Sequence, residues 1–431
     1  MSSKSWLSAK PIRIHGLLLA VLLWTVYAVD MSTPGLSDRN GLVKGTDFLH
    51  FYTLGRLALQ DRGDLLYDMR AQADLARQFV ANAPDSLYVP LYGPQVSLFF
   101  APFTRLPYGD ALAVWLAVNV LIYAFCCYAV WKSCPGLQTY RCTVLILAVA
   151  FPGFFHLLAW GQTSGLALLC FTLAYLALRR DLTLLAGLAI GSLIFKPQLG
   201  LAAAVVLVLA REWKVVAGAV MAASIQLAAA WIHYGSEVMS TYLGALRHVE
   251  GVLPLLEPRL YQTHSLRAFW SLLLPWPRVA FALYAVSTVA ILVLAVRVWR
   301  SRSALTVRFS ALLLATVLVS PHLTVYDLII LAPAFLLLGD WAVVDREQMF
   351  APRIQQLLYL CYPLFLMGPL TQVTHLQLSV PAMTALLWTI WRVSSREVSS
   401  PPTTLPVSSG AEHQRSLANA DAQSKDPYDL H

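Results

Sequence analysis

Long apolar runs separated by short polar segments occupy most of this chain. Four of the longest, residues 16–29, 111–131, 279–296 and 308–320, contain a single charged residue, Arg308. With their flanks, runs of this length cross about 30 Å of hydrocarbon as helices. The pattern predicts an all-α fold, a polytopic integral membrane bundle of about 10–12 spans.

About twelve segments fit this pattern, although several are shorter than a usual span. The neighbouring segments 182–195 and 198–210 are either two tilted helices or one hairpin that dips into the membrane. We expect the first segment to be retained, because Val26-Tyr27-Ala28 is a poor signal-peptide cleavage site. The expected spans are 14–31, 111–131, 142–159, 163–178, 182–195, 198–210, 214–234, 279–297, 308–320, 325–338, 355–370 and 377–392.

Composition supports the membrane class. Of 431 residues, 58% are hydrophobic and 13% are charged, whereas a soluble domain carries about twice that charge. The net charge of +8 comes from small Lys and Arg clusters that fall between alternate spans, which favours membrane topology over nucleic-acid binding. The positive-inside rule then places both termini in the cytoplasm.

Two segments on the opposite, outer side are too long to be simple connectors. They cover about residues 32–110 and 235–278, and long loops of this kind usually carry function. Within the first, residues 51–60 and 71–81 have apolar positions at helical spacing with arginines between them. We expect these to be interfacial helices, with apolar faces against lipid or protein.

Polar and proline-rich stretches complete the organisation of the chain. The segment from Tyr88 to Pro94 contains two prolines and a glycine, which predicts an extended crossing. From residue 394 to 431 the chain becomes rich in Ser, Pro and Thr and then polar. This composition predicts a disordered cytoplasmic tail after a membrane domain of residues 1–393.

One carboxylate stands where the first span reaches the far side of the bilayer. Asp47 lies within Gly45-Thr46-Asp47-Phe48-Leu49-His50. The few ionisable groups close to the apolar part of a membrane protein are usually functional. Asp47 is therefore our candidate for the residue that performs the chemistry; the alternative is an N-cap for a helix that starts near Phe48.

Short motifs then follow in a series, and their order is more informative than any one of them. The motifs are Asp47-Phe48, Tyr52, Arg56, Gly63 to Asp68, Tyr88 to Leu91, Ala101 to Phe103, Leu106-Pro107, Trp115 with Asn119, Gly161-Gln162, Phe195 to Gln198, and Ser320 to His322 with Tyr326-Asp327. The series covers about residues 40–340 and resembles glycosyltransferase family 87, of the GT-C class, whose members include polyprenyl-phosphate-mannose-dependent mannosyltransferases. One departure is Tyr88 to Pro94, where the family more often reads Tyr-x-Tyr-Pro-Pro.

The resemblance implies a GT-C-type bundle with a catalytic aspartate in its first outward loop, here Asp47. It also implies transfer of a hexose, usually mannose, from a polyprenyl-phosphate donor to a lipid or glycan acceptor, with inversion and no cofactor. Such a reaction takes place at the outer face of the inner membrane, in contact with membrane lipids. It needs a base for the attacking hydroxyl and cations for the phosphate that leaves.

Three later residues are candidates for the donor side of the site. Lys196 either holds the donor phosphate or is an interfacial lysine that extends towards water. His322 is expected to bond the donor phosphate or the acceptor. Asp327 either supports the site or bonds Lys196 or a helix end, and a direct pair with His322 requires a turn at Pro321.

Four residues are expected to support the site or to bind the acceptor: Tyr52, Arg56, Tyr92 and Gln162. An amide such as Gln162 can donate and accept hydrogen bonds with sugar hydroxyls, although such a Gln more often caps a helix. The histidines and glutamates of the second outer segment match no compact ligand set, so no metal is expected.

Two other classes stay open at this point. A lipid-linked glycan polymerase or ligase would rely on arginines in its outer loops. A transporter would place ionisable groups at mid-membrane in broken helices, whereas the notable charges here fall on the outer face. The sequence has no nucleotide-binding glycine pattern, which weighs against a nucleotide-sugar donor or an ATP-driven pump.

Overall fold

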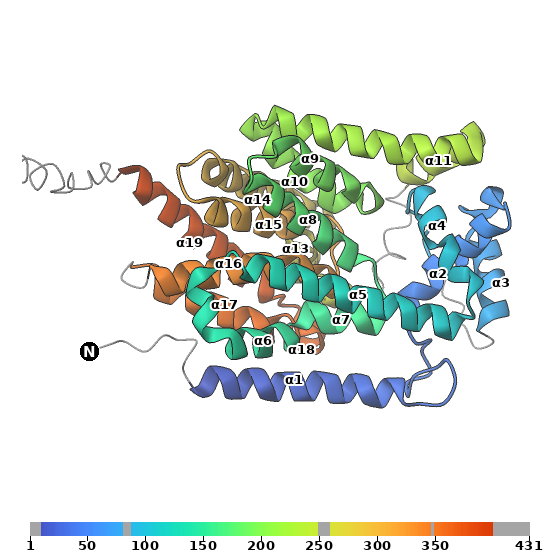
Figure 1. Cartoon of the computed structure of the whole chain (residues 1–431), viewed down its shortest axis with the longest axis horizontal. Helices are drawn as coiled ribbons and strands as arrows, with labels where there is room; N and C mark the ends of the chain where they lie inside the picture. The colour runs from blue at the N-terminus through green and yellow to red at the C-terminus, as the bar shows by residue number, and fades with distance from the viewer. Residues whose placement is uncertain (1–9, 81–87, 249–258, 346–348, 400–431) are drawn as a thin grey trace, which may run out of the picture.

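This computed structural model describes residues 10–80, 88–248, 259–345 and 349–399, and the regular elements of these residues are helices (Figure 1). Within these residues the extended contacts are two isolated antiparallel bridges, between Ser37 and Val43 and between Thr263 and Thr324. The predicted all-α class is confirmed.

Five helical segments are long and apolar enough to cross a membrane, and two bent pairs raise the number to as many as seven. The protein is therefore a multi-pass membrane protein, as expected, while a count of 10–12 spans stays a prediction. The five are α1 (Lys10–Met31), α5 (Tyr108–Trp131), α11 (Trp213–Arg247), α14 (Pro277–Trp299) and the continuous segment Val325–Val344, formed by η7 (Val325–Leu331) and α16 (Ala332–Val344).

Two expected spans are broken in the structure. Residues 142–159 divide into α6 (Arg141–Val149), preceded by η4 (Pro135–Tyr140), and α7 (Pro152–Trp160), with a bend of 41°. Residues 355–370 divide into α17 (Ala351–Leu364) and α18 (Gly368–Thr374), with a bend of 82°. Proline lies at both breaks. It lacks the N–H that would continue the helical hydrogen bonds, so the helix is interrupted there.

Four further apolar helices are shorter than a usual span. The second and third of them meet at Lys196, and whether they are two tilted helices or one hairpin that dips into the membrane stays a prediction. They are α8 (Ser164–Leu178), α9 with η5 (Thr183–Gly191 and Ser192–Phe195), α10 (Pro197–Ala210) and α15 (Leu305–Val319).

The bundle has a buried centre and exposed apolar edges. Helix α15 is buried along nearly its whole length, and 89% of the Val325–Val344 window is buried, against 17% for α1. Helices α1 and α11 run along opposite edges, with α8, α15 and α16 between them (Figure 1). A helix that is apolar on all sides belongs in such a core or against lipid.

Small residues allow α9 and α11 to pack very closely. A Cβ atom on Gly191 would lie 2.0 Å from the carbonyl oxygen of Ala219, and one on Gly187 would lie 2.1 Å from that of Val215. Membrane helices commonly use small residues in this way, because the hydrophobic effect does not drive them together within lipid. The contact holds the α9–α10 region, and hence Lys196, against the long helix.

The first outer segment folds into helices at one end of the bundle (Figure 1). They are α2 (Thr46–Leu59), η2 (Gly63–Leu65), α3 (Met69–Phe79), α4 (Gln95–Phe100) and η3 (Ala101–Arg105). Helix α2 lies inside the protein rather than at the interface, since Phe48 packs against Phe100 and Trp115. Helix α3 buries only part of its surface, including Leu75 and Ala76, and fits the amphipathic expectation.

The second outer segment is shorter than expected, because α11 continues as a helix beyond a kink at Gly235. It then includes η6 (Leu260–Gln262) and α13 (Leu266–Leu273). The backbone N–H of His264 donates to the carbonyl oxygen of Leu323 at 3.0 Å. This contact, with the bridge from Thr263 to Thr324, attaches the outer segment to the turn before η7.

The C-terminal helix corrects the expected start of the tail. Helix α19 spans Ser379–Ser399, so residues 394–399 continue a helix, and the rest of the expected tail lies outside the described residues. Both described ends of the chain lie at the end of the bundle opposite α2, α3 and α4 (Figure 1).

Candidate active site

Asp47 lies in the first turn of α2 and does not cap it. The N-cap position is Gly45, with φ of 65°, and no side chain caps the helix. A side chain at Gly45 would be strained by this φ, and its Cβ would lie 2.5 Å from Leu112. The capping alternative for Asp47 is therefore wrong, and its carboxylate is left for other contacts.

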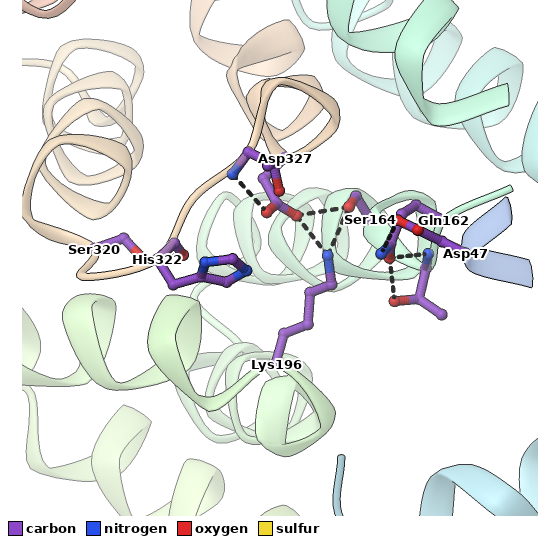
Figure 2. Close-up of polar contacts among 9 residues, drawn as sticks. Asp47, Gln162, Ser164, Lys196, Ser320, His322 and Asp327 are labelled. Carbon is purple, nitrogen blue, oxygen red and sulfur yellow. Dashed lines mark hydrogen bonds and ion pairs between the residues drawn. The ribbon is translucent and has the colours of Figure 1, made fainter. Parts of the chain in front are cut away.

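Gln162 provides the hydrogen bond to this carboxylate. Its Nε2 donates to Asp47 Oδ2 at 2.8 Å (Figure 2). The residue follows the left-handed Gly161, which ends α7 and allows the turn to approach α2 closely. The indole N–H of Trp115 donates to the carbonyl oxygen of Gly161 at 2.9 Å and fixes the turn. Gln162, expected to bind sugar or cap a helix, contacts the candidate base instead.

Burial makes Asp47 a stronger base than an exposed carboxylate. It raises the pKa of Asp47 to about 6, although the Gln162 hydrogen bond and the charge of Lys196 oppose this effect. A general base is most effective when its pKa lies near the working pH. A carboxylate with such a pKa is suited to accept a proton near neutrality.

Lys196 and Asp327 form a buried ion pair. Lys196 Nζ lies 2.5 Å from Asp327 Oδ1, and the two side chains are 2% and 1% exposed. Ser164 joins them, since its Oγ accepts from Lys196 at 2.8 Å and donates to Asp327 at 2.6 Å (Figure 2). Lys196 therefore does not extend towards water.

Asp327 also supports the start of η7. Its carboxylate and the side chain of Thr324 form a capping box at this helix end, a pattern that satisfies otherwise unpaired backbone donors. The structure thus has both contacts that the sequence left open for Asp327, with Lys196 and with a helix end. They connect α8, the start of α10 and the start of η7.

His322 precedes η7 in the turn that contains Pro321, as the sequence requires for it to approach Asp327. Ser320 Oγ donates to the backbone carbonyl oxygen of His322 at 3.1 Å. Burial lowers the pKa of His322 to about 4, against the opposing charge of Asp327. The imidazole is therefore neutral near pH 7 and serves as a hydrogen-bond partner rather than a cation.

A cavity of about 920 Å³ opens beside these groups. Its polar lining includes Tyr92, Lys196, Arg267, His322 and Asp327. Asp47 is not among the lining residues. Its partner Gln162 lies two residues before Ser164, which bonds both Lys196 and Asp327 of the lining. The candidate base therefore lies next to the cavity.

The comparison with protein families agrees with the motif series. Residues 91–321 match the model of glycosyltransferase family 87, which is 231 of the 431 residues. The chain belongs to glycosyltransferase family 87. The matched segment includes Gln162 and Lys196 but begins after Asp47 and ends before His322. No curated protein and no solved structure gives a significant match.

Two of the expected site residues of this glycosyltransferase lie elsewhere. The hydroxyl of Tyr52 donates to the carbonyl oxygen of Leu106 at 2.8 Å. Arg56 donates to that of Thr104 at 3.4 Å. Both side chains hold α2 against the η3 region, and the structure does not bring them to the cavity.

Sequence reasoning missed two residues of the site. Tyr88 donates from its hydroxyl to the carbonyl oxygen of Thr46 and so holds the turn that carries Asp47. Arg267 lies on α13, lines the cavity and donates from Nε to the carbonyl oxygen of Pro321. The second outer segment contains four arginines, Arg247, Arg259, Arg267 and Arg278, so charge alone does not single out Arg267 in the sequence.

The candidate site thus places a carboxylate of raised pKa next to a cavity lined by lysine, arginine and neutral imidazole groups. Among the described residues, no group of three or more His, Cys, Asp or Glu side chains is placed to hold a metal ion. These side chains can perform acid–base chemistry and can stabilise an anion.

Proposed function

We propose that this glycosyltransferase transfers a hexose, with mannose as the first candidate, from a polyprenyl-phosphate donor to a hydroxyl of a lipid or glycan acceptor. The observation that carries the proposal is the position of Asp47. Its carboxylate has a raised pKa and lies beside a cavity that is lined by Lys196, Arg267 and His322.

In the proposed reaction, Asp47 takes the proton of the acceptor hydroxyl. The hydroxyl oxygen then attacks the anomeric carbon of the donor sugar, and the bond between that carbon and the phosphate oxygen breaks. Polyprenyl phosphate leaves with the bonding electron pair, and the anomeric configuration inverts. Arg267, His322 and the ammonium of Lys196 stabilise the phosphate by charge and hydrogen bonding.

The apolar part of the cavity supports a lipid-linked donor. Phe195, Leu274, Ala280 and Phe281 contribute to its lining. Phe281, near the start of the membrane-capable α14, is 65% exposed. A prenyl chain placed along this helix would bring its phosphate towards the polar side of the cavity, with both parts in suitable surroundings.

The charge pattern supports a site at the outer face of the inner membrane, with both termini in the cytoplasm. The arrangement of the described chain agrees, because its two ends lie at the end of the bundle opposite α2 (Figure 1). Family membership favours this transferase over a transporter.

The test is sugar transfer in membranes that contain the protein. Labelled polyprenyl-phosphate mannose, glucose and galactose are supplied in parallel, and the labelled product is identified by mass spectrometry. We expect transfer from one donor, and a loss of about 10²–10⁴-fold in Asp47→Asn, because a positioned base contributes a factor of this size. Asp110→Asn, an exposed carboxylate in the first turn of α5, is the matched control.

Two results would contradict the proposal. Retained transfer by Asp47→Asn would remove Asp47 as the base. Absence of transfer from every prenyl-linked donor, with inserted and folded protein, would remove the donor class.

A further inference from the structure

We propose that Gln162 is a positioning residue for Asp47. Its amide, held by Thr163, donates a hydrogen bond to Asp47 Oδ2, and Asp47 Oδ1 receives the proton of the acceptor hydroxyl. This inference rests on the proposed function of Asp47 and goes beyond it, because it assigns separate tasks to the two carboxylate oxygens.

The contacts of Gln162 allow only one orientation of its amide. Its Oε1 accepts from the backbone N–H of Thr163 at 2.9 Å and lies 3.3 Å from the Thr163 hydroxyl. A backbone N–H can only donate, so the amide oxygen must face Thr163 and the NH₂ group must face Asp47. The reverse orientation would place two oxygens 2.8 Å apart and leave the N–H of Thr163 against another donor.

The backbone that carries this amide is also fixed. The N–H of Gln162 donates to the carbonyl oxygen of Leu157 at 3.1 Å, and Trp115 holds the preceding Gly161. Gln162 itself is 5% exposed. The donor is therefore in place before any substrate binds, which is the condition for effective stabilisation of a charge.

A neutral amide suits this task better than a cation would. Asp47 ionises in a partly buried site, and the hydrogen bond from Gln162 favours the charged form that acts as base. A full positive charge at the same place would lower the basicity of the carboxylate much further, as ion pairs do. Within the described residues, the other titratable groups that interact with Asp47 are Lys196, Asp327, His322, Tyr88, Tyr92, Tyr108 and Tyr326.

The experiment measures the protonation of Asp47 directly. Purified protein in detergent, without substrate, is titrated by infrared spectroscopy, and the carboxyl band absent from Asp47→Asn is assigned to Asp47. In Gln162→Leu we expect the midpoint of this band to rise by about one pH unit or more, because a hydrogen bond to a charged group has been removed. Gln162→Glu should raise it further, since two adjacent carboxyl groups then share a proton.

In Gln162→Leu, the acid limb of the plot of transfer rate against pH should shift to higher pH by the same amount. Gln355→Leu is the matched control. This half-buried amide donates one hydrogen bond in another part of the chain, to the backbone carbonyl oxygen of Ala342 at 3.0 Å. The control variant should leave the band and the limb unchanged. Gln162→Met, with a similar side-chain length, repeats the measurement if Gln162→Leu does not fold.

A wild-type titration and pH profile in folded Gln162→Leu or Gln162→Met would overturn the positioning role. If Asp47→Asn is inactive in that case, the proposed function still stands. If Asp47→Asn is active, the proposed function fails whatever the behaviour of Gln162.

Discussion

Asp47 and Asp327 are two carboxylates of one site with very different partners. Asp327 is 1% exposed and contacts the ammonium of Lys196, the hydroxyl of Ser164 and the start of η7. Asp47 is only partly buried, and a neutral amide, that of Gln162, is its hydrogen-bond partner. Each lies at the start of a helical segment, so the difference comes from the residues packed against them.

This difference indicates how one site can contain a structural and a reactive carboxylate. A buried charge that is paired and hydrogen-bonded contributes to a fixed arrangement, and breaking the pair leaves an uncompensated charge. A carboxylate that is desolvated without a cation in contact has a raised pKa and can exchange a proton near neutral pH. The environment therefore assigns base chemistry to Asp47 and support to Asp327.

The largest effect should come from breaking the ion pair of the structural carboxylate, Asp327. Asp327→Asn would leave Lys196 charged and buried without its counter-ion. We expect the free energy of unfolding to fall by about 3–5 kcal/mol, the usual cost of removing one partner of a buried pair. Lys196→Met combined with Asp327→Asn should recover most of this loss, because no buried charge then remains.

Thermal unfolding in detergent measures these changes. Asp340→Asn serves as the control, since this buried carboxylate accepts the backbone N–H of Leu137 at 3.1 Å and should cost about 1 kcal/mol. A double variant as unstable as Asp327→Asn would show that Lys196 has a stabilising role besides charge compensation.

The pH dependence of sugar transfer tests the reactive carboxylate, Asp47. Because Asp47 has a pKa of about 6 and must be deprotonated to act, kcat/KM should rise about tenfold per pH unit below pH 6 and level off above it. His322, with a pKa of about 4, stays neutral over this range and should add no second limb between pH 5 and 8. A rate that stays constant from pH 5 to pH 8 would mean that burial does not raise the pKa of the base.

The smallest expected effect concerns the free energy of unfolding, which ionisation of Asp47 lowers. Since the pKa of Asp47 is raised on folding, from 3.8 to about 6, its ionisation destabilises the folded protein as pH rises through this window. Asp47→Asn cannot ionise, so at pH 7.5 it should be more stable than the wild type by about 1–2 kcal/mol. The gain should disappear near pH 4.

Melting temperatures of the wild type, Asp47→Asn and Asp110→Asn at these two pH values provide the test. An Asp47→Asn protein less stable than the wild type at pH 7.5 would indicate that the ionised carboxylate supports the fold, as Asp327 does.

Much of the fold followed from the pattern of apolar residues. The all-α class and the helices within residues 32–110 were predicted because each depends on a local period or on the length of a run. The burial of α2 was not, since Phe48, Phe100 and Trp115 meet only through packing. The helix to Ser399 was missed because polar composition alone does not end a helix.

The candidate site shows the same limit more sharply. Asp47 was identified by its place after the first span, and the Pro321 turn correctly put His322 ahead of η7. Tyr52 and Arg56 stand close to Asp47 in sequence, but their side chains bond carbonyl oxygens of residues 104–106. Sequence proximity on one helix does not determine what each side chain faces.

The sequence by itself determined that this protein is a helical membrane bundle of glycosyltransferase family 87, because apolar run length and motif order are properties of the chain alone. The tertiary structure decided which carboxylate receives Lys196 and which receives Gln162. Those partners are 131 and 115 residues away in the sequence. Their contacts, and the basicity that follows from them, exist only once the helices have packed.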